Sequence, residues 1–154
     1  MKNLILALVL SVFFSSPAFA TEVVRDGTVT QAYANSVVKV LTWTGLDGDD
    51  SGKAMNLSGY ADKTIHIYGT FDSATVTVYC SNDPLVLVDR AAGTLFSAKT
   101  ASWVACVDAQ GGALAKTAAG IETIMENPLY ILPVITGGGG SASLKVVIAA
   151  KKDY

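Results

Sequence analysis

The clearest pattern of hydrophobic and polar positions lies between Gly59 and Asp83. Up to Phe71, apolar residues and glycine alternate with Thr, His and Tyr, and a second alternation runs from Thr75 to Cys80. A period of two is typical of strands that bury one face and expose the other. Because Gly, Asp and Ser residues separate the two runs, we expect a tight turn and a β-hairpin.

Other segments have the β-branched and aromatic composition of strands. They are Val37–Thr44, Pro84–Asp89, Ser102–Asp108, Tyr130–Thr136 and Leu144–Ala150, with weaker strand signals at Gly27–Tyr33 and around Leu95. Pro133 predicts that its strand is at a sheet edge or contains a bulge, because proline cannot donate to the ladder. The spacing of Ile121, Ile124 and Met125 predicts one short helical turn near 118–126, ended by Pro128.

Seven to nine short antiparallel strands, separated by turn signals, predict an all-β fold. We expect a single β-sandwich of immunoglobulin-like or jelly-roll type. The organisation we infer is a signal peptide at 1–20, an extended N-terminal arm at 21–36 and the β-sandwich domain at 37–154.

The first twenty residues have the pattern of a secretory signal peptide. Lys2 precedes an apolar run from Leu4 to Phe14, and Ala18-Phe19-Ala20 is a small-x-small cleavage site. We therefore expect export to the periplasm, the cell surface or the medium. The alternative is an uncleaved anchor, although the run is shorter than the roughly 20 residues that span a bilayer. After signal cleavage we expect no membrane span.

Cleavage after Ala20 would leave ten basic and thirteen acidic residues, a net charge of −3. The basic residues are scattered, apart from Lys151 and Lys152. A mildly acidic chain without a basic stripe is a poor binder of phosphate backbones, so we expect no nucleic-acid partner.

Cys80 and Cys106 are the two cysteines. Each shares a strand face with valines, and an even count in an exported chain favours a disulfide. The enclosed loop of about 25 residues predicts a stabilisation on the order of 3.5 kcal/mol in the chain-entropy model. The alternative is a pair of free thiols that pack as small hydrophobes.

No catalytic group or cofactor site is evident. His66 is the single histidine, on the polar face of its strand, and neither a nucleophile elbow nor a carboxylate cluster accompanies it. We expect a solvent-facing histidine and a protein that is not an enzyme. Two cysteines and one histidine are too few for a structural zinc site.

The loop Asp47-Gly48-Asp49-Asp50-Ser51-Gly52 partly matches a calcium-binding loop. The bidentate glutamate of an EF-hand is replaced by Ser58, so Asp47, Asp49 and Asp50 are only a weak calcium candidate and we favour a simple turn. The run Gly137–Gly140 lacks the Lys-Ser/Thr of a phosphate loop and predicts a turn between strands.

Exposed aromatic rings could form a contact surface. Tyr68 and Tyr79 fall on the polar sides of the two alternating runs and are the best candidates, for a glycan or for a protein partner. The alternative is ordinary packing between neighbouring strands.

Five segments, taken together and in order, resemble a family of small virion structural proteins of tailed bacteriophages and prophages. The pattern is Gly-Thr-Phe-x2-Ala-Thr-Val-Thr, Ser-Asn-Asp, Ala-Ala-Gly-Ile-Glu, Glu-Asn-Pro-x-Tyr and Pro-Val-x-Thr-Gly-Gly. Here it is carried by Tyr60–Phe71, Ala74–Asp83, Trp103–Leu114, Thr117–Pro128 and Tyr130–Gly138. The resemblance implies a decoration-type protein without catalytic residues.

The chain departs from that family in four ways. The signal peptide, the two cysteines, the insertion Pro84–Ala101 and Leu132 in place of an arginine are not typical of it. The signal peptide and the cysteines change together, as expected for a version adapted to an oxidising compartment.

Three functions follow as hypotheses. The first is a non-enzymatic structural protein that self-associates or packs on a virion or surface lattice; its location would be the virion if a phage encodes it. The second is an exported β-sandwich binding module for a glycan or a surface protein. The third, a secreted enzyme, has no nucleophile–base pair or metal set to support it.

Overall fold

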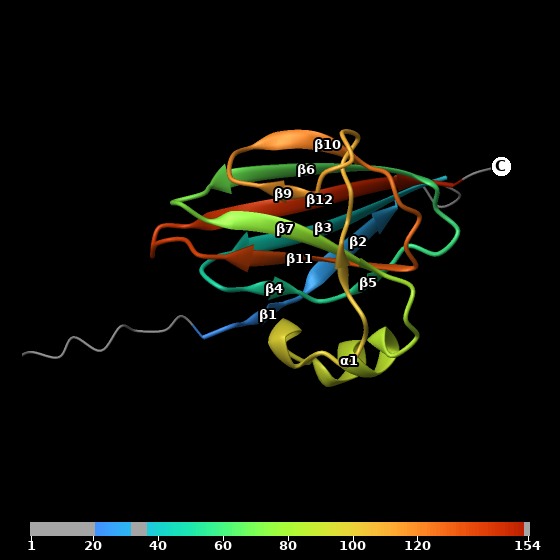
Figure 1. Cartoon of the computed structure of the whole chain (residues 1–154), viewed down its shortest axis with the longest axis horizontal. Helices are drawn as coiled ribbons and strands as arrows, with labels where there is room; N and C mark the ends of the chain where they lie inside the picture. Colours follow the sequence, from blue (N-terminus) through green and yellow to red (C-terminus); the bar gives the residue numbers. More distant parts are fainter. Residues whose placement is uncertain (1–20, 32–36, 153–154) are drawn as a thin grey trace, which may run out of the picture.

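The computed structural model describes residues 21–31 and 37–152. The predicted signal peptide, residues 32–36 of the predicted arm and residues 153–154 lie outside the described part. Two sheets stack face to face around one apolar core (Figure 1). The β-sandwich expected from the sequence is therefore confirmed.

Sheet B has five strands in the order β10-β6-β12-β3-β2. Its strands are β2 (Gly27–Gln31), β3 (Val38–Leu46), β6 (Asp62–Thr70), β10 (Gly120–Ile124) and β12 (Ser143–Lys151). Every pairing in it is antiparallel. The last strand of the chain, β12, is the central one.

Sheet A has the order β1-β4-β11-β7-β8, with β5 paired to β11 and β9 paired to β7. Its strands are β1 (Val24–Arg25), β4 (Ser51–Gly52), β5 (Met55–Asn56), β7 (Thr75–Ser81), β8 (Val104–Ala105), β9 (Ala115–Lys116) and β11 (Tyr130–Thr136). The β1–β4 pair is parallel. The predicted N-terminal arm thus supplies one strand to each sheet.

The alternating strands β6 and β7 do not form the expected hairpin. β6 pairs with β10 and β12, whereas β7 pairs with β8, β9 and β11. The turn between them, with Asp72 and Ser73 at positive φ, crosses from one sheet to the other. Both strands direct their apolar residues into the shared core, so the two strands form a β-arch.

Three further expectations are wrong, and a fourth is only partly right. Pro84–Asp89 is mostly helical, because α1 spans Val86–Ala92, and the segment near Leu95 leads into a 3-10 helix, η1 (Phe96–Ala98). The helical turn expected near 118–126 is instead strand β10, since pairing with β6 overrides a weak helical spacing. Of Ser102–Asp108, only Val104–Ala105 is a strand, with an isolated bridge at Val107.

Strand β11 lies inside sheet A, not at an edge, and is paired on both sides. Pro133 fits there because the neighbouring strand is interrupted between β4 and β5. The N–H of Ile135 bonds to Asp50 on that side, so by alternation the missing N–H of Pro133 also faces the interruption. Both faces of β11 are buried, and the insertion with α1 covers the outer one.

Candidate assembly surface and the sites predicted from the sequence

The outer face of sheet B is a flat surface built from three rows of aligned side chains. The register places one outward residue from each of the five strands in the central row: Ile121, His66, Val147, Thr42 and Thr28. The second row is Thr123, Thr64, Ala149, Val40 and Thr30, and the third is Tyr68, Lys145 and Thr44. Inward neighbours such as Leu41, Ile65 and Ile148 are fully buried, which fixes the orientation of each row.

These thirteen side chains include one lysine and one histidine and are otherwise uncharged. A fourth outward row, at the far end of the strands, is Asp62, Lys151 and Val38. The Lys145 Nζ lies 5.6 Å from the centre of the Tyr68 ring, and the rings of His66 and Tyr68 are 4.5 Å apart. Tyr68 is half-buried and His66 is exposed, as the sequence predicts for the polar side of the strand. The charged groups therefore lie at the two ends of the face, and His66, threonine, valine, alanine and Ile121 occupy the middle.

The size of the face is suited to a protein contact. Five strands about 4.8 Å apart and five residues long cover roughly 400 Å² in projection. That area is about half of what one partner buries in a specific interface, typically about 800 Å² of accessible surface, and corresponds to the class of small, weak contacts. Charged residues are depleted at interface centres, as they are here.

Tyr79 does not join Tyr68 in one contact surface. Tyr79 projects from β7 on the outer side of sheet A, and its ring lies 4.6 Å from that of Phe96. It packs on a second apolar cluster formed by residues of β11 and of the insertion. The two tyrosines therefore face opposite sides of the sandwich, because β6 and β7 belong to different sheets, and Tyr79 has the packing role.

The candidate calcium loop is held by an arginine of the N-terminal arm. The Nε of Arg25 lies 2.6 Å from a carboxylate oxygen of Asp50, and its terminal nitrogen lies 3.2 Å from Asp47. Asp50 is almost fully buried and also accepts the backbone N–H of Asp47 at 3.1 Å. Asp49 instead accepts the N–H of Gly137 at 3.2 Å. Asp47 and Asp50 thus share the guanidinium of Arg25, whereas Asp49 bonds to a backbone N–H.

The glycine run at 137–140 is the turn between β11 and β12. Gly137 and Gly138 have positive φ, which glycine adopts without strain. The backbone N–H of Ser141 bonds to the carboxylate of Asp72 at 3.1 Å, so this turn and the β-arch lie side by side.

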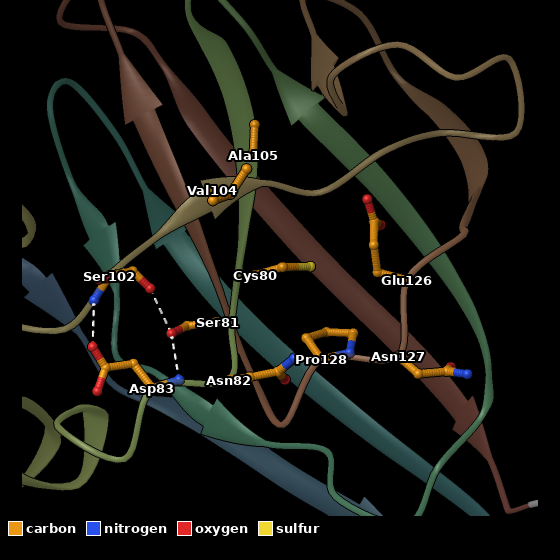
Figure 2. Close-up of a pocket in the computed structure, with 10 residues that line it drawn as sticks. All are labelled: Cys80, Ser81, Asn82, Asp83, Ser102, Val104, Ala105, Glu126, Asn127 and Pro128. Carbon is orange, nitrogen blue, oxygen red and sulfur yellow. Dashed lines mark hydrogen bonds between the residues drawn. The ribbon is translucent and has the colours of Figure 1, made fainter.

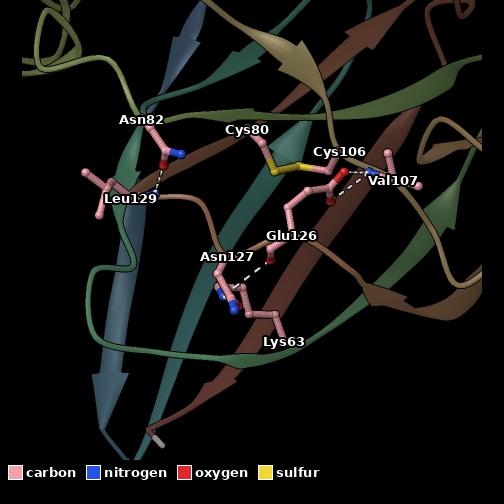
Figure 3. The surroundings of a disulfide bond; sticks show 8 residues. All are labelled: Lys63, Cys80, Asn82, Cys106, Val107, Glu126, Asn127 and Leu129. Atoms are coloured by element: carbon pink, nitrogen blue, oxygen red, sulfur yellow. Dashed lines mark hydrogen bonds between the residues drawn. A yellow bond between two sulfur atoms is a disulfide. The ribbon is translucent and has the colours of Figure 1, made fainter. Parts of the chain in front are cut away.

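Cys80 and Cys106 form a disulfide that joins β7 to the segment after β8, with Cα atoms 5.2 Å apart (Figure 3). The carboxylate of Glu126 lies beside it and accepts the N–H of Val107 at 2.8 Å through each oxygen. The two sulfurs and this carboxylate are close enough together to share a metal ion. In the disulfide, however, the two sulfurs are bonded to each other and are not thiolate ligands.

Next to the disulfide, Lys63 is buried without a carboxylate partner. Its Nζ donates to the carbonyl of Ala61 at 2.9 Å and to the amide oxygen of Asn127 at 2.7 Å. Figure 3 shows Lys63 beside Asn127. Burial lowers the pKa of Lys63, and the charge of Asp62 only partly offsets this. Its role is structural, because it joins the backbone just before β6, at Ala61, to Asn127 in the loop that follows β10.

An open pocket of about 430 Å³ lies between β7, β8 and the loop after β10 (Figure 2). Its polar side chains are already used within the protein. Asp83 accepts the N–H groups of Ser102 and Leu85, each at 2.9 Å, and these bonds hold the pKa of Asp83 below its usual range. The carboxylate of Glu126 accepts the backbone N–H of Val107. The pocket therefore presents few free polar groups to a ligand.

Sequence reasoning missed two features. The insertion that carries α1 was expected to contain a strand and a loop, although Asp83-Pro84 before it and Gly93 after it are helix boundary signals. Glu22 was treated as part of a plain arm, yet its carboxylate accepts bonds from Ser51, Phe96 and Ser97. No local sequence signal could reveal those contacts, because the partners are far along the chain.

Within the described residues, no helix is long and apolar enough to cross a membrane.

The fold and the uncovered sheet face define a two-sheet β-sandwich with a candidate surface for protein contacts. No protein-family model matches the chain, and no curated protein sequence matches it.

Among solved structures, the chain is similar to the crystal structure of the SPBc2 prophage-derived protein YomS. The TM-score is 0.50, over 77% of this chain and 97% of that chain, at 8% sequence identity. At this identity, the similarity shows a shared fold.

Proposed function

We propose that the chain is a non-enzymatic structural protein, related to those of phage particles, that is exported and assembles through the outer face of sheet B. The observation that carries the proposal is the register of the outward side chains, which leaves two rows without Lys, Arg, Asp or Glu across all five strands. A surface of threonine, valine and alanine loses little side-chain entropy on contact.

The physical reason for assembly is the contrast between the two outer faces. The outer face of sheet A is covered by α1 and η1 of the insertion, whereas no described segment covers that of sheet B. Small side chains allow sheets to stack about 10 Å apart, so a second copy can approach this face closely. The prophage origin of the protein YomS, which shares the fold, supports a particle or lattice role.

A second function is favoured by the ring arrangement at one end of the face. Tyr68, flanked by His66 and Lys145, offers an aromatic surface of the kind that stacks on sugars. A glycan-binding module would use this end alone and would leave the Thr, Val and Ala rows free.

Light scattering or sedimentation across a concentration series tests the assembly proposal. We expect the processed chain, residues 21–154, to form dimers or larger species, and Val147→Glu to remove them by placing a charge at the centre of the face. Val104→Glu is the matched control, because Val104 is 71% exposed on the edge strand β8 of the other sheet.

A monomer at every concentration, in the original chain and in both variants, would contradict assembly through this face. Sugar binding that is lost in Tyr68→Ala and kept in Val147→Glu would favour the glycan module. Turnover of an ester, glycoside or peptide substrate, abolished by His66→Ala, would show that the chain is an enzyme.

A further inference from the structure

Helix α1 has apolar residues on both of its sides. On the inner side Val86 is fully buried, and the buried carboxylate of Asp89 accepts the backbone N–H groups of Thr100 and Ala101. On the outer side Leu87 is 54% exposed and Val88 is 62% exposed. The insertion is therefore folded onto the domain by one side and presents a second apolar side to the solvent.

No exposed residue between Pro84 and Leu95 carries a charge. The exposed residues are Pro84, Leu85, Leu87, Val88, Ala91, Ala92, Gly93 and Leu95. Asp89 is buried and Arg90 is half-buried. We call these eight residues the α1 patch. A surface helix of a soluble domain ordinarily turns charged or polar residues outward, so this patch requires a partner.

The beginning of the domain is bound to the same insertion. The Glu22 carboxylate accepts the backbone N–H of Phe96 and, at 2.9 Å, the hydroxyl of Ser97, only a few residues after α1. The apolar run of the predicted leader ends at Phe14, seven positions before Thr21. Seven residues span at most about 25 Å when fully extended, so the covalent reach from Thr21 to that run is no longer than this.

We propose that the α1 patch contacts the lipid bilayer into which the leader inserts. The insertion is then a second membrane-contacting element of the chain that still carries its leader. Two weak membrane signals act together: the short apolar leader and the aliphatic side chains of α1. Neither a short apolar segment nor a small apolar patch binds a membrane stably alone, but two such elements joined in one chain do.

The composition of the patch favours lipid over a protein partner. The centres of protein interfaces are enriched in Tyr, Trp, Phe, Met and Arg, which give directional contacts. The α1 patch consists of Leu, Val, Ala, Gly and Pro, which bury area without specific geometry. The outer face of sheet B lies on the opposite side of the sandwich, so a chain held in this way keeps that face free. The proposal does not depend on assembly.

Quenching by brominated lipid tests the contact directly. The full chain, residues 1–154, carrying Leu87→Trp, is reconstituted into phosphatidylcholine vesicles with and without bromine on the acyl chains. The control is Ile121→Trp, because Ile121 is 66% exposed on the outer face of sheet B. Of the native tryptophans, Trp43 is fully buried, and the signal of the unsubstituted chain is subtracted.

We expect brominated lipid to reduce the added Leu87→Trp fluorescence at least twofold and to leave that of Ile121→Trp almost unchanged. We also expect Leu87→Asp/Val88→Asp to raise the exposure of a tryptophan at Leu85 to an aqueous quencher. Equal quenching at the two positions, or a full chain that does not associate with vesicles, would overturn the proposal. Concentration-dependent dimers abolished by Leu87→Asp/Val88→Asp would assign the patch to a second copy and would also overturn it.

Discussion

The Nε of Arg25 lies 2.6 Å from the carboxylate of Asp50, and this contact joins strand β1 to an aspartate that is almost completely buried. A carboxylate at this depth depends on its donors, because an unpaired buried charge is costly. The contact therefore decides whether the N-terminal arm belongs to the stable part of the fold.

The first prediction concerns this pair. Arg25→Ala leaves Asp50 with one backbone N–H, so we expect the free energy of unfolding to fall by about 2 kcal/mol, less than for a fully buried pair because Arg25 is partly exposed. Urea unfolding measures it. Lys53→Ala is the control, because its partner Asp26 is 85% exposed and that pair should contribute less than about 0.5 kcal/mol. Equal effects would contradict the prediction.

The second prediction is a pH dependence from Glu22. Burial alone would raise the pKa of Glu22, but hydrogen bonds from Ser51, Phe96 and Ser97 outweigh it and hold the pKa below its usual value. The stabilisation is therefore complete above the unfolded-state pKa of about 4.3 and is lost as the pH falls through the lower folded-state value.

Glu22→Gln should lower the free energy of unfolding by on the order of 1 kcal/mol at pH 7, and the difference from the original chain should shrink below about pH 4. Urea unfolding from pH 7 to pH 3 measures both, with Asp26→Asn as the exposed control. A difference that stays constant over this range would be inconsistent with a depressed pKa.

The third prediction concerns the disulfide. The bond closes a separation of 26 residues, for which loss of the cross-link should lower the free energy of unfolding by roughly 3.5 kcal/mol. Cys80→Ala/Cys106→Ala is compared with the oxidised chain in urea. Intact mass after alkylation, with and without reductant, establishes the state of the exported protein. Two alkylated cysteines without reductant would refute the bond.

The fourth prediction concerns calcium. Asp47 and Asp50 bond to Arg25, and Asp49 bonds to a backbone N–H, so an ion would have to displace these donors. Calorimetric titration should show no binding of calcium below millimolar concentration, since the bidentate glutamate of tight sites is also missing. A micromolar isotherm would make the loop a functional site.

The fifth prediction concerns Gly69. Its φ is +126°, and a Cβ at this position would lie 2.2 Å from the carbonyl oxygen of Ser143 on β12. Gly69→Ala should lower the free energy of unfolding by about 3 kcal/mol or more, because both strain and a backbone clash result. Gly45→Ala is the control. Gly45 also has positive φ, but a Cβ built there would meet no other atom within 4 Å, so we expect the free energy of unfolding to fall by only about 1 kcal/mol. Similar costs would contradict the clash.

The sequence predicts which residues face the core better than which strands pair. Alternation correctly places Ile65, Ile67, Val76 and Val78 inside. It cannot distinguish a hairpin from an arch, because both satisfy a period of two, and the partners of each strand are set by residues far along the chain. The expectation that Tyr79 and Tyr68 belong to one contact surface was wrong because of this single ambiguity.

Helix and strand were confused where short runs carry both signals. Leu85–Val88 is β-branched and apolar, yet α1 forms because Asp83 accepts the N–H of Leu85 at the start and Gly93 ends the helix in a left-handed conformation. Around Ile121 the spacing suits a helix, but five residues pair with β6 instead. Tertiary pairing decides such segments.

The central place of β12 in sheet B has a consequence for how an exported chain matures. Among the described residues of sheet B, β3 and β6 do not pair with each other, and β12 lies between them and pairs with both. A chain that crosses a membrane N-terminus first therefore cannot close this sheet until residues 143–151 have emerged. If the chain is exported as we propose, this order of strands would delay closure of sheet B until the end of its passage through the membrane.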